Sequence, residues 1–341
     1  MESSSLLLLT GATGHVGYAV LVEALKAGHS VRVSIRRSDQ KEMLLSSESI
    51  RRLELPPGVL TFTIIPDITE EGAFDEALVG VRHVIHVASP LPRVQVADLE
   101  REIVEPAVKG TENLLTAACK HPTIERVVIT SSVAAIAQIF NPGRHLATLT
   151  ADSRQPNYEA DFVKDTDTAY AAAKTAALNA IDEFVRIKKP SFAVTSIIPA
   201  YVFGPKGLAR TVRDVLNGSN LIGLGSAMVD FAWDDHIVSA SSCHIDDLAA
   251  AHIRALAPEF TGNESFVLAS QFEPLGIIDI LEKRFPEAVE KGVFARKSLY
   301  QWHHIPIDTT RTESELLGRK LKGFDEQIVD TAAQALSLLA T

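Results

Sequence analysis

The sequence has little cysteine and no long apolar run, and each absence excludes a class of protein. Cys119 and Cys243 are the two cysteines, and neither belongs to a CxxC motif or a Cys/His cluster. A disulfide framework and a structural zinc site are therefore not indicated, and a reducing compartment is favoured. No stretch approaches the roughly 18 to 20 apolar residues of a membrane span, and the early run Leu6 to Leu9 is too short for a signal peptide. We expect a soluble, cytoplasmic protein.

Basic charge is also scarce. The 33 Lys and Arg against 43 Asp and Glu give a formal net charge of −10. This balance disfavours nucleic acid or an anionic membrane as the main partner, so any basic site must be local. The 19 glycines and 16 prolines are too few for a collagenous or low-complexity chain. A length of 341 residues allows a large core and roughly two structural units.

The chain instead alternates short apolar runs with longer helical patterns through its first two hundred residues. This alternation predicts an α/β protein with a Rossmann-type doubly wound parallel sheet. The expected strands are Leu6–Thr10, Val31–Ile35, Leu60–Ile65, His83–Val87, Arg126–Thr130 and Ala193–Ile198. The expected helices are Val16–Ala27, Gly72–Val79, Asp98–Lys120, Thr168–Lys188, Asp246–Leu256, Gly276–Arg284 and Phe324–Leu339. Asp246 is the expected N-cap of its helix.

After Pro199 the pattern changes to glycine-containing loops, which more often shape a pocket than build a sheet. We therefore expect residues 1–199 and about 236–270 to form a dinucleotide-binding domain. Residues from about 200–235, with 271–341, are expected to form a smaller substrate-binding lobe. A linker that would separate two independent domains is not evident, so the two parts are expected to share one body.

A glycine turn follows the first expected strand and precedes the first expected helix. Gly11, Gly14 and Gly17 form the pattern GxxGxxG. In this context one glycine permits a tight turn, another lets the backbone approach a pyrophosphate, and the last lets helix and strand pack closely. The free N–H groups of the helix N-terminus favour phosphate. The turn, including Thr13, His15 and Val16, is the expected dinucleotide site.

Basic side chains follow the second expected strand. In dinucleotide-binding folds the residues at this position distinguish NAD from NADP. A carboxylate there would hold the 2′-hydroxyl of NAD, whereas Arg would accept the 2′-phosphate of NADP. The sequence has Arg36 and Arg37 there, followed by Lys41, with no carboxylate before Asp39. We predict NADP(H), with Arg36 ahead of Arg37 as its ligand. The alternative is that these are solvated loop charges.

A tyrosine and a lysine lie one helical turn apart in the sequence Tyr170-Ala-Ala-Ala-Lys174. A carbonyl reductase needs a proton donor at the carbonyl oxygen, and a lysine next to a phenol would lower its pKa. A third group should hold the oxygen by a hydrogen bond. Ser132, at the end of the fifth expected strand, is the first candidate, and Ser131 is the alternative.

With these residues, the chain resembles an extended short-chain dehydrogenase/reductase. It is similar to the dihydroflavonol reductase and cinnamoyl-CoA reductase group, and most of all to fungal ketone and aldehyde reductases of the methylglyoxal reductase type. Ala173 departs from the pattern, because a serine often precedes the lysine. The further motifs that carry the resemblance are Pro66-Asp67-Ile68, His86-Val87-Ala88-Ser89-Pro90, Glu105–Thr111, Pro199–Pro205 and His244–Ala249.

The resemblance implies an NADPH-dependent reductase that converts a ketone or aldehyde to an alcohol, with Ser132, Tyr170 and Lys174 as its catalytic residues. It also implies further cofactor contacts: Asp67 and Ile68 at the adenine, Val87, Ala88 and Ser89 beneath the cofactor, and Lys174, Pro199 and Val202 near the nicotinamide. Two alternatives stay open. One is a nucleotide-sugar epimerase or dehydratase with bound NAD, and the other is a non-catalytic regulator that senses NADP.

The pocket and the assembly are less well defined by the sequence. An apolar or aromatic substrate is suggested by candidate lining residues, each of which is more often core: Phe140, Tyr201, Val202, Phe203, Phe231 and Trp233. His303 and His304 lack accompanying ligands, so a metal site is not expected. His86 is expected to serve packing. The chain is expected to be a monomer or a homodimer.

Overall fold

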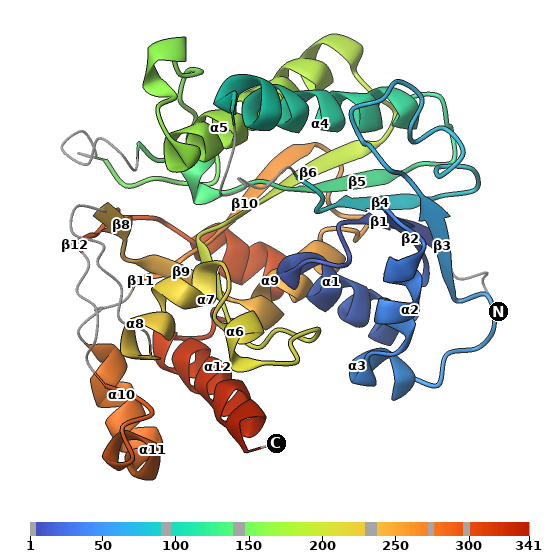
Figure 1. The fold of residues 1–341 in the computed structure, drawn as a ribbon. Helices are drawn as coiled ribbons and strands as arrows, with labels where there is room; N and C mark the ends of the chain where they lie inside the picture. The colour runs from blue at the N-terminus through green and yellow to red at the C-terminus, as the bar shows by residue number, and fades with distance from the viewer. Residues whose placement is uncertain are drawn as a thin grey trace.

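A seven-stranded parallel sheet forms the centre of the protein, whose computed structural model describes residues 5–89, 97–138, 147–228, 237–271, 276–295 and 301–340 (Figure 1). The strand order is β10-β6-β5-β4-β1-β2-β3. The bounds are β1 Leu6–Thr10, β2 Ser30–Ile35, β3 Leu60–Ile64, β4 His83–His86, β5 Arg126–Thr130, β6 Ala193–Pro199 and β10 Asn263–Leu268. The predicted Rossmann-type fold and its six expected strands are confirmed, while β10 was not expected.

The strand order reverses between β1 and β4, and this switch point positions the site. Strands to one side of β1 continue through β2 and β3, whereas those to the other side begin with β4. In open parallel sheets, ligands bind in the crevice at such a point, outside the carboxyl ends of the strands. The glycine turn after β1 and the loop after β4 therefore face the same crevice.

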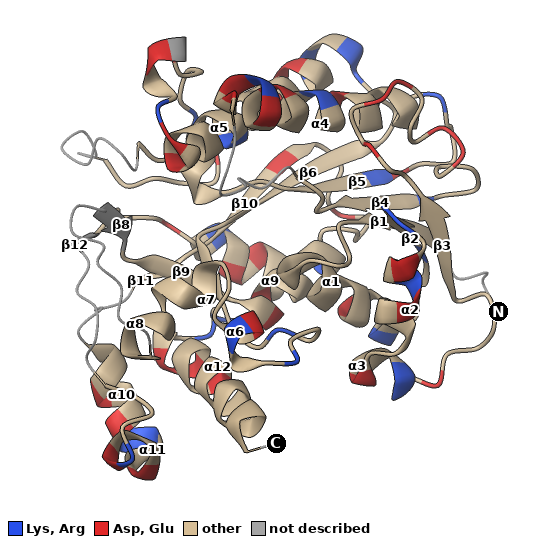
Figure 2. Ribbon diagram, viewed as in Figure 1, with Lys and Arg blue, Asp and Glu red and all other residues tan. Residues whose placement is uncertain are grey.

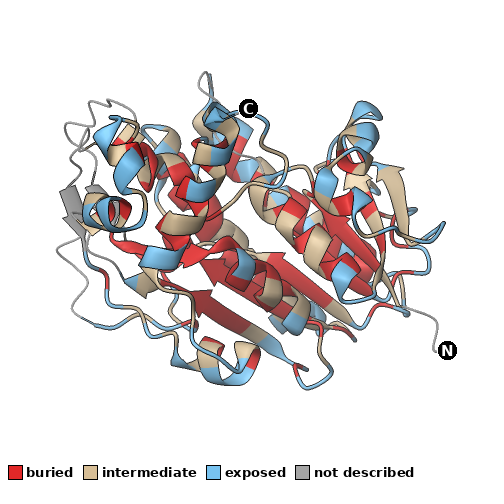
Figure 3. Ribbon diagram, turned by 90° about the horizontal axis from the view of Figure 1, so that it is seen from below, coloured by how far each residue is buried: buried red, intermediate tan, exposed pale blue. Residues whose placement is uncertain are grey.

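Helices cover both faces of the sheet (Figure 1). One face carries α1 (His15–Lys26) and α9 (Ile245–Arg254); the other carries α4 (Glu105–Ala118) and α5 (Thr166–Lys188). Successive residues of β1 point to opposite faces of the sheet. Leu7 and Leu9 therefore pack beneath α1, whereas Leu8 packs beneath α4. The central strands are largely buried, as is typical of parallel sheets, whereas the edge strand β3 is only partly buried (Figure 3).

The helical expectations are mostly confirmed, with one error. A wide, π-helical turn over Glu100–Val104 leads directly into α4. Residues 72–79, expected as a helix, form successive turns instead. Gly72, the first residue of the expected helix, has φ +76°, which lies outside the right-handed helical region. Two short helices beside β2 were not expected, α2 (Asp39–Leu45) and α3 (Glu48–Arg51).

A second hydrophobic cluster lies beside the main sheet and includes Phe203, Leu224, Leu281 and Ile328. Its helices are α6 Val212–Val215, α7 Ser219–Ile222, α8 Gly225–Met228, α10 Gly276–Arg284, α11 Pro286–Glu290 and α12 Phe324–Leu339. A small sheet with the order β11-β9-β7 consists of β7 Tyr201–Phe203, β9 Ser241–His244 and β11 Ser270–Gln271. A parallel pair joins β8 (Ile237–Ser239) to β12 (Gln301–His303). The proposed domain boundaries stay a prediction.

Polar bonds attach the C-terminal helix α12 to the elements before it. Ser242 Oγ, on β9, donates a hydrogen bond of 2.6 Å to Gln327 Oε1. In the loop after β7, the backbone N–H of Lys206 donates to Gln334 Oε1, and Gln334 Nε2 donates to the Lys206 carbonyl, both at 2.8 Å. These bonds, with the apolar face of α12, hold the second cluster together.

Charged side chains gather on the helices and loops (Figure 2). Within the described ranges, no helix is long and apolar enough to cross a membrane.

Candidate active site

Two of the three glycines in the turn after β1 are required by the fold itself. Gly11 has φ +76°, and a Cβ there would lie 2.7 Å from the Ala88 nitrogen. A Cβ on Gly17 would lie 2.1 Å from the Gly11 carbonyl oxygen. Gly14 differs, because its Cβ would meet that oxygen at an ordinary 3.4 Å. Its lack of a side chain keeps the N-terminus of α1 open.

The first turn of α1 has the features of an anion site. Gly14 is the N-cap and supplies no side-chain acceptor, and the first turn carries no acidic residue. Its N–H groups and the helix dipole therefore remain available to a phosphate. Gly14 is exposed, and Thr13, His15 and Val16 are partly exposed around it.

His15 connects this turn to the loop after β7. Its Nε2 lies 3.3 Å from the Pro205 carbonyl oxygen. Burial and the nearby Lys206 ammonium lower the pKa of His15 to about 3. A neutral imidazole therefore donates its Nε2 proton to Pro205, which couples the expected phosphate turn to the second cluster.

The structure separates the roles of the basic side chains after β2. The guanidinium of Arg37 makes two contacts of 3.0 Å with the Asp39 carboxylate. Within the described part of the chain, the Arg36 guanidinium makes no comparable hydrogen bond or ion pair. Lys41 Nζ lies 5.7 Å from the centre of the Phe62 ring. Arg36 is thus the side chain that is most available to an external anion.

Asp67 and Ile68 follow β3, next to the end of β2. Asp67 Oδ1 accepts hydrogen bonds from the Thr69 N–H at 2.8 Å and the Thr69 hydroxyl at 2.7 Å. These bonds lower the pKa of Asp67, with smaller contributions from Lys109 and Arg36. Ile68 is buried. The two expected adenine neighbours therefore lie in an ordered turn near Arg36.

The loop after β4 is held by the last residue of β1. Thr10 Oγ1 accepts hydrogen bonds from the N–H groups of Val87 at 3.2 Å and Ala88 at 3.0 Å. It lies 2.9 Å from His86 Nδ1, to which it donates its own proton. Burial lowers the pKa of His86 to about 3. Thr10 was not among the expected site residues, although its place at the end of β1, directly before the glycine turn, was a usable signal.

Tyr170 and Lys174 lie one turn apart on α5. Lys174 is 8% exposed, and its Nζ donates a hydrogen bond of 3.3 Å to Ser89 Oγ. Burial lowers the pKa of Lys174 to about 8. Its Nζ lies 5.7 Å from the centre of the Tyr170 ring. The helix begins at Asp165, whose carboxylate caps it together with Thr168.

Burial raises the pKa of the Tyr170 phenol, and the nearby Ser132 side chain opposes that rise. The net direction for the phenol is therefore upward, and the expectation that Lys174 lowers this pKa stays a prediction; its ammonium lies 5.7 Å from the centre of the ring and bonds to Ser89. The phenol stays protonated at neutral pH, as a proton donor must.

The structure also distinguishes the two serines after β5. Ser132 is the N-cap of a short helical turn, Val133–Ala135, and its Oγ accepts a hydrogen bond of 3.2 Å from the Ala134 N–H. The backbone N–H of Ser131 donates a hydrogen bond of 2.7 Å to the Ile197 carbonyl oxygen on β6, so Ser131 extends the pairing of β5 with β6. The Ser131 hydroxyl is buried without a partner among the described residues. Ser132 is the serine that affects the pKa of Tyr170.

The expected substrate-pocket residues divide into three groups. Phe140, Phe231 and Trp233 lie outside the described residues. Phe203 is fully buried in the second cluster, so it is core. Tyr201 and Val202 lie on β7, which Ala200 alone separates from Pro199 at the end of β6. Val202 packs on the main core, while Tyr201 remains partly exposed.

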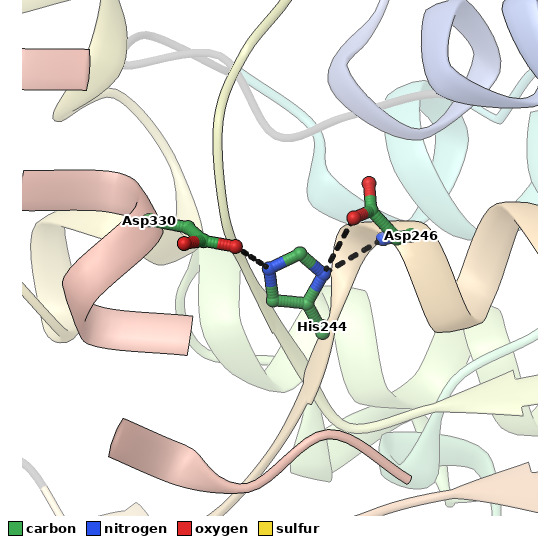
Figure 4. A group of neighbouring side chains, drawn as sticks. All are labelled: His244, Asp246 and Asp330. Atoms are coloured by element: carbon green, nitrogen blue, oxygen red, sulfur yellow. Dashed lines mark hydrogen bonds and ion pairs between the residues drawn. The ribbon is translucent and has the colours of Figure 1, made fainter. Parts of the chain in front are cut away.

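His244, Asp246 and Asp330 form a compact polar cluster between α9 and α12 (Figure 4). The expectation that Asp246 caps α9 is wrong: the N-cap is His244, whose Nδ1 accepts a hydrogen bond of 3.0 Å from the Asp246 N–H. The Nε2 therefore carries the proton and donates it to Asp330 Oδ2 at 3.2 Å. Lys322 Nζ lies 2.9 Å from Asp246 Oδ2. The cluster already holds a cation and joins two helices, which favours a structural role over metal binding.

Comparison with known proteins gives consistent matches over nearly the whole chain. A sequence profile of the NAD dependent epimerase/dehydratase family matches residues 7–269. The chain is 44% identical to the NAD-dependent epimerase/dehydratase ALT6 of Alternaria alternata, with 98% of each chain covered. It is 33% identical to the ketoreductase CTB6 of Cercospora nicotianae, over 98% of this chain and 96% of that one. The crystal structure of yeast methylglyoxal/isovaleraldehyde reductase Gre2, complexed with NADPH, has a TM-score of 0.80 at 27% identity, covering 98% of this chain and 99% of Gre2.

Proposed function

The chain belongs to the NAD dependent epimerase/dehydratase family of extended short-chain dehydrogenases/reductases, and we propose that it is an NADPH-dependent reductase that converts a ketone or aldehyde to an alcohol. The resemblance drawn from its motifs is thereby confirmed. Its relatives include a ketoreductase and a methylglyoxal reductase, so an oxidoreductase is the coarse functional class.

The observation that carries the proposal is the arrangement of Ser132, Tyr170 and Lys174. The Tyr170 hydroxyl donates its proton to the carbonyl oxygen of the substrate, and Ser132 donates a hydrogen bond to the same oxygen. The phenolate that forms is stabilised by the nearby Lys174 ammonium and is then reprotonated from water. NADPH, when bound, supplies the hydride that the carbonyl carbon accepts.

The residues around the crevice fit this cofactor. The open N-terminus of α1 at Gly14 suits a pyrophosphate, and the available guanidinium of Arg36 suits a 2′-phosphate. Thr13, His15 and Val16 would line the pyrophosphate, with Arg37 and Lys41 as further basic neighbours. Asp67 and Ile68 would border the adenine, and Val87, Ala88 and Ser89 would lie beneath the cofactor. Pro199 and Val202 would lie near the nicotinamide.

An epimerase or dehydratase with tightly held NAD is the second candidate, because ALT6 carries that name. The residues after β2 disfavour NAD as the cofactor, because the first carboxylate there is Asp39 and it already forms an ion pair with Arg37. A ribose-binding carboxylate is thus missing where NAD would need one. Stoichiometric NAD that stays with the purified protein would support this candidate. A non-catalytic NADP sensor has no need of Tyr170 and Lys174.

The test is NADPH oxidation measured against a panel of ketones and aldehydes, followed by Tyr170→Phe on an accepted substrate. We expect Tyr170→Phe to lose at least about a hundredfold in kcat while it still binds NADPH, because only the proton donor is removed. Tyr18→Phe is the matched control, since its hydroxyl bonds to Ser47, away from the site. Equal turnover by the parent and Tyr170→Phe would refute the assignment of the acid.

A further inference from the structure

A buried amide bridges the two elements that carry the proposed proton-transfer residues. Gln155 is 8% exposed, and its side-chain Nε2 faces three acceptors. The acceptors are the carbonyl oxygens of Ala134 and Ala135, each at 3.3 Å, and Thr175 Oγ1 at 3.0 Å. The other end of the amide, Oε1, accepts a hydrogen bond of 3.3 Å from the Tyr158 hydroxyl.

The partners of Gln155 belong to two different elements. Ala134 and Ala135 form the short helical turn that begins at Ser132. Thr175 is fully buried on α5, directly after Lys174. One side chain thus joins the turn that carries the serine to the helix that carries the tyrosine and lysine. No other part of the proposed mechanism uses this side chain.

The contacts also fix how the amide is oriented. Two of its neighbours are backbone carbonyls, which can only accept, so the NH₂ group must face them. The Tyr158 hydroxyl can donate to the oxygen at the opposite end. Apolar packing of Val133 and Ile136 near Leu178 holds the turn close to α5, but it is not directional. The hydrogen bonds of Gln155 are directional, so they fix the position of the Val133–Ala135 turn along the axis of α5.

We propose that Gln155 is a positioning residue that fixes the turn beginning at Ser132 relative to Tyr170 and Lys174 on α5. This rests on the proposed reductase function, because it assigns a support to the same site. Gln155 does not touch the reacting atoms. It acts through the turn at Ala134 and Ala135 and through Thr175.

The chain offers a matched control on the same loop. Asn179, one turn further along α5 than Thr175, donates a hydrogen bond of 3.0 Å from its Nδ2 to the Gln155 backbone carbonyl. It also donates to Asn157 Oδ1 at 2.7 Å. Asn179→Ala therefore loosens the loop from α5 but leaves the Gln155 amide in place. Gln155→Met removes the amide and keeps the length of the side chain.

The kinetic test compares kcat, KM for NADPH and the pH profile of alcohol oxidation in these variants. A misplaced serine is expected to lower kcat about tenfold or more in Gln155→Met, while KM for NADPH stays within about twofold. In alcohol oxidation the Tyr170 phenolate acts as the base, and Ser132 lowers the pKa of this phenol. If Gln155→Met displaces Ser132, the pKa of Tyr170 should rise, and the rate of oxidation should increase only at higher pH than in the parent. In Asn179→Ala the pH dependence of the rate should be unchanged.

A second readout needs no substrate and separates this proposal from the proposed function. The ionisation of Tyr170 is followed by tyrosinate absorbance after a rapid pH jump, with Tyr170→Phe as the blank. An upward shift of the Tyr170 pKa in Gln155→Met supports the positioning role, whether or not the parent reduces a carbonyl. If the parent reduces no carbonyl, that result counts against the reductase function alone. An unshifted titration overturns the positioning role, whatever the turnover. If Gln155→Met does not fold, Thr175→Val takes its place, because it removes one of the acceptors of the Gln155 amide. An upward shift of the Tyr170 pKa in this variant supports the positioning role, and an unshifted pKa overturns it.

Discussion

Replacing Lys174 with methionine is expected to make the protein more stable and almost inactive. The side chain is 8% exposed, and burial lowers its pKa from 10.5 to about 8. That fall corresponds to a cost of about 3 kcal/mol for keeping the ammonium charged in the folded protein. Its hydrogen bond to Ser89 is long, at 3.3 Å, and its loss costs about 1 kcal/mol. The free energy of unfolding at pH 7 should therefore rise by about 2 kcal/mol.

The pH dependence of this gain has a definite sign. The folded pKa of Lys174 lies below the unfolded one, so between about pH 8 and 10.5 the unfolded chain binds more protons. The cost is fully present below pH 8 and disappears as the pH rises through this window. The advantage of Lys174→Met over the parent should thus be largest near pH 7 and small at pH 10.

Urea unfolding at both pH values measures the difference, and NADPH oxidation measures the loss of activity. Lys188→Met is the control, because Lys188 is exposed at the end of the same helix. It should change the free energy of unfolding by no more than about 0.5 kcal/mol at either pH. The reasoning is refuted if Lys174→Met is less stable than the parent at pH 7, or if its advantage does not depend on pH.

Three further substitutions and one change of pH have expected outcomes. Gly17→Ala should lower the free energy of unfolding by at least about 2 kcal/mol, because its Cβ would lie 2.1 Å from a carbonyl oxygen. Gly14→Ala should change stability by less than about 1 kcal/mol and yet weaken NADPH binding, as calorimetry would measure. Arg36→Ala should raise KM for NADPH about tenfold or more and KM for NADH far less, which steady-state kinetics would check. Burial lowers the pKa of His86 to about 3 and that of His252 to about 4. Below pH 6.5 the unfolded chain binds these two protons and the folded chain does not, so urea unfolding should show at least about 3 kcal/mol less stability at pH 5 than at pH 6.5.

The sequence predicted the parts of the fold that local pattern determines. The strands from β1 to β6 are short runs rich in leucine and β-branched residues, and their expected bounds agree with the structure within about one residue. Strand β10 was missed because it begins with Asn263, Glu264 and Ser265, which resemble a loop. These residues are in a strand because they pair with β6, a long-range contact that local pattern does not contain.

The candidate site shows the same division. The glycine turn, Tyr170 and Lys174 were recognisable because each lies within one short motif, and their catalytic and cofactor roles stay predictions. The bridge made by Gln155 was not visible, since its partners lie about 20 residues away on either side in sequence. The cap of α9 was assigned to Asp246 on residue type, whereas the backbone geometry places His244 there. The direction of the Tyr170 pKa depends on burial, which a sequence pattern does not measure.

The bonds that attach α12 bear on how the protein folds during synthesis. Every strand of the main sheet is complete by Leu268, whereas α12 begins at Phe324. Because the chain leaves the ribosome from its N-terminus, the sheet can form while His244 on β9 and Lys206 after β7 still lack their partners on α12. A nascent chain at this stage holds the formed glycine turn after β1 beside a second cluster whose apolar residues are not yet covered by α12, and such exposed apolar surface is what chaperones protect during synthesis.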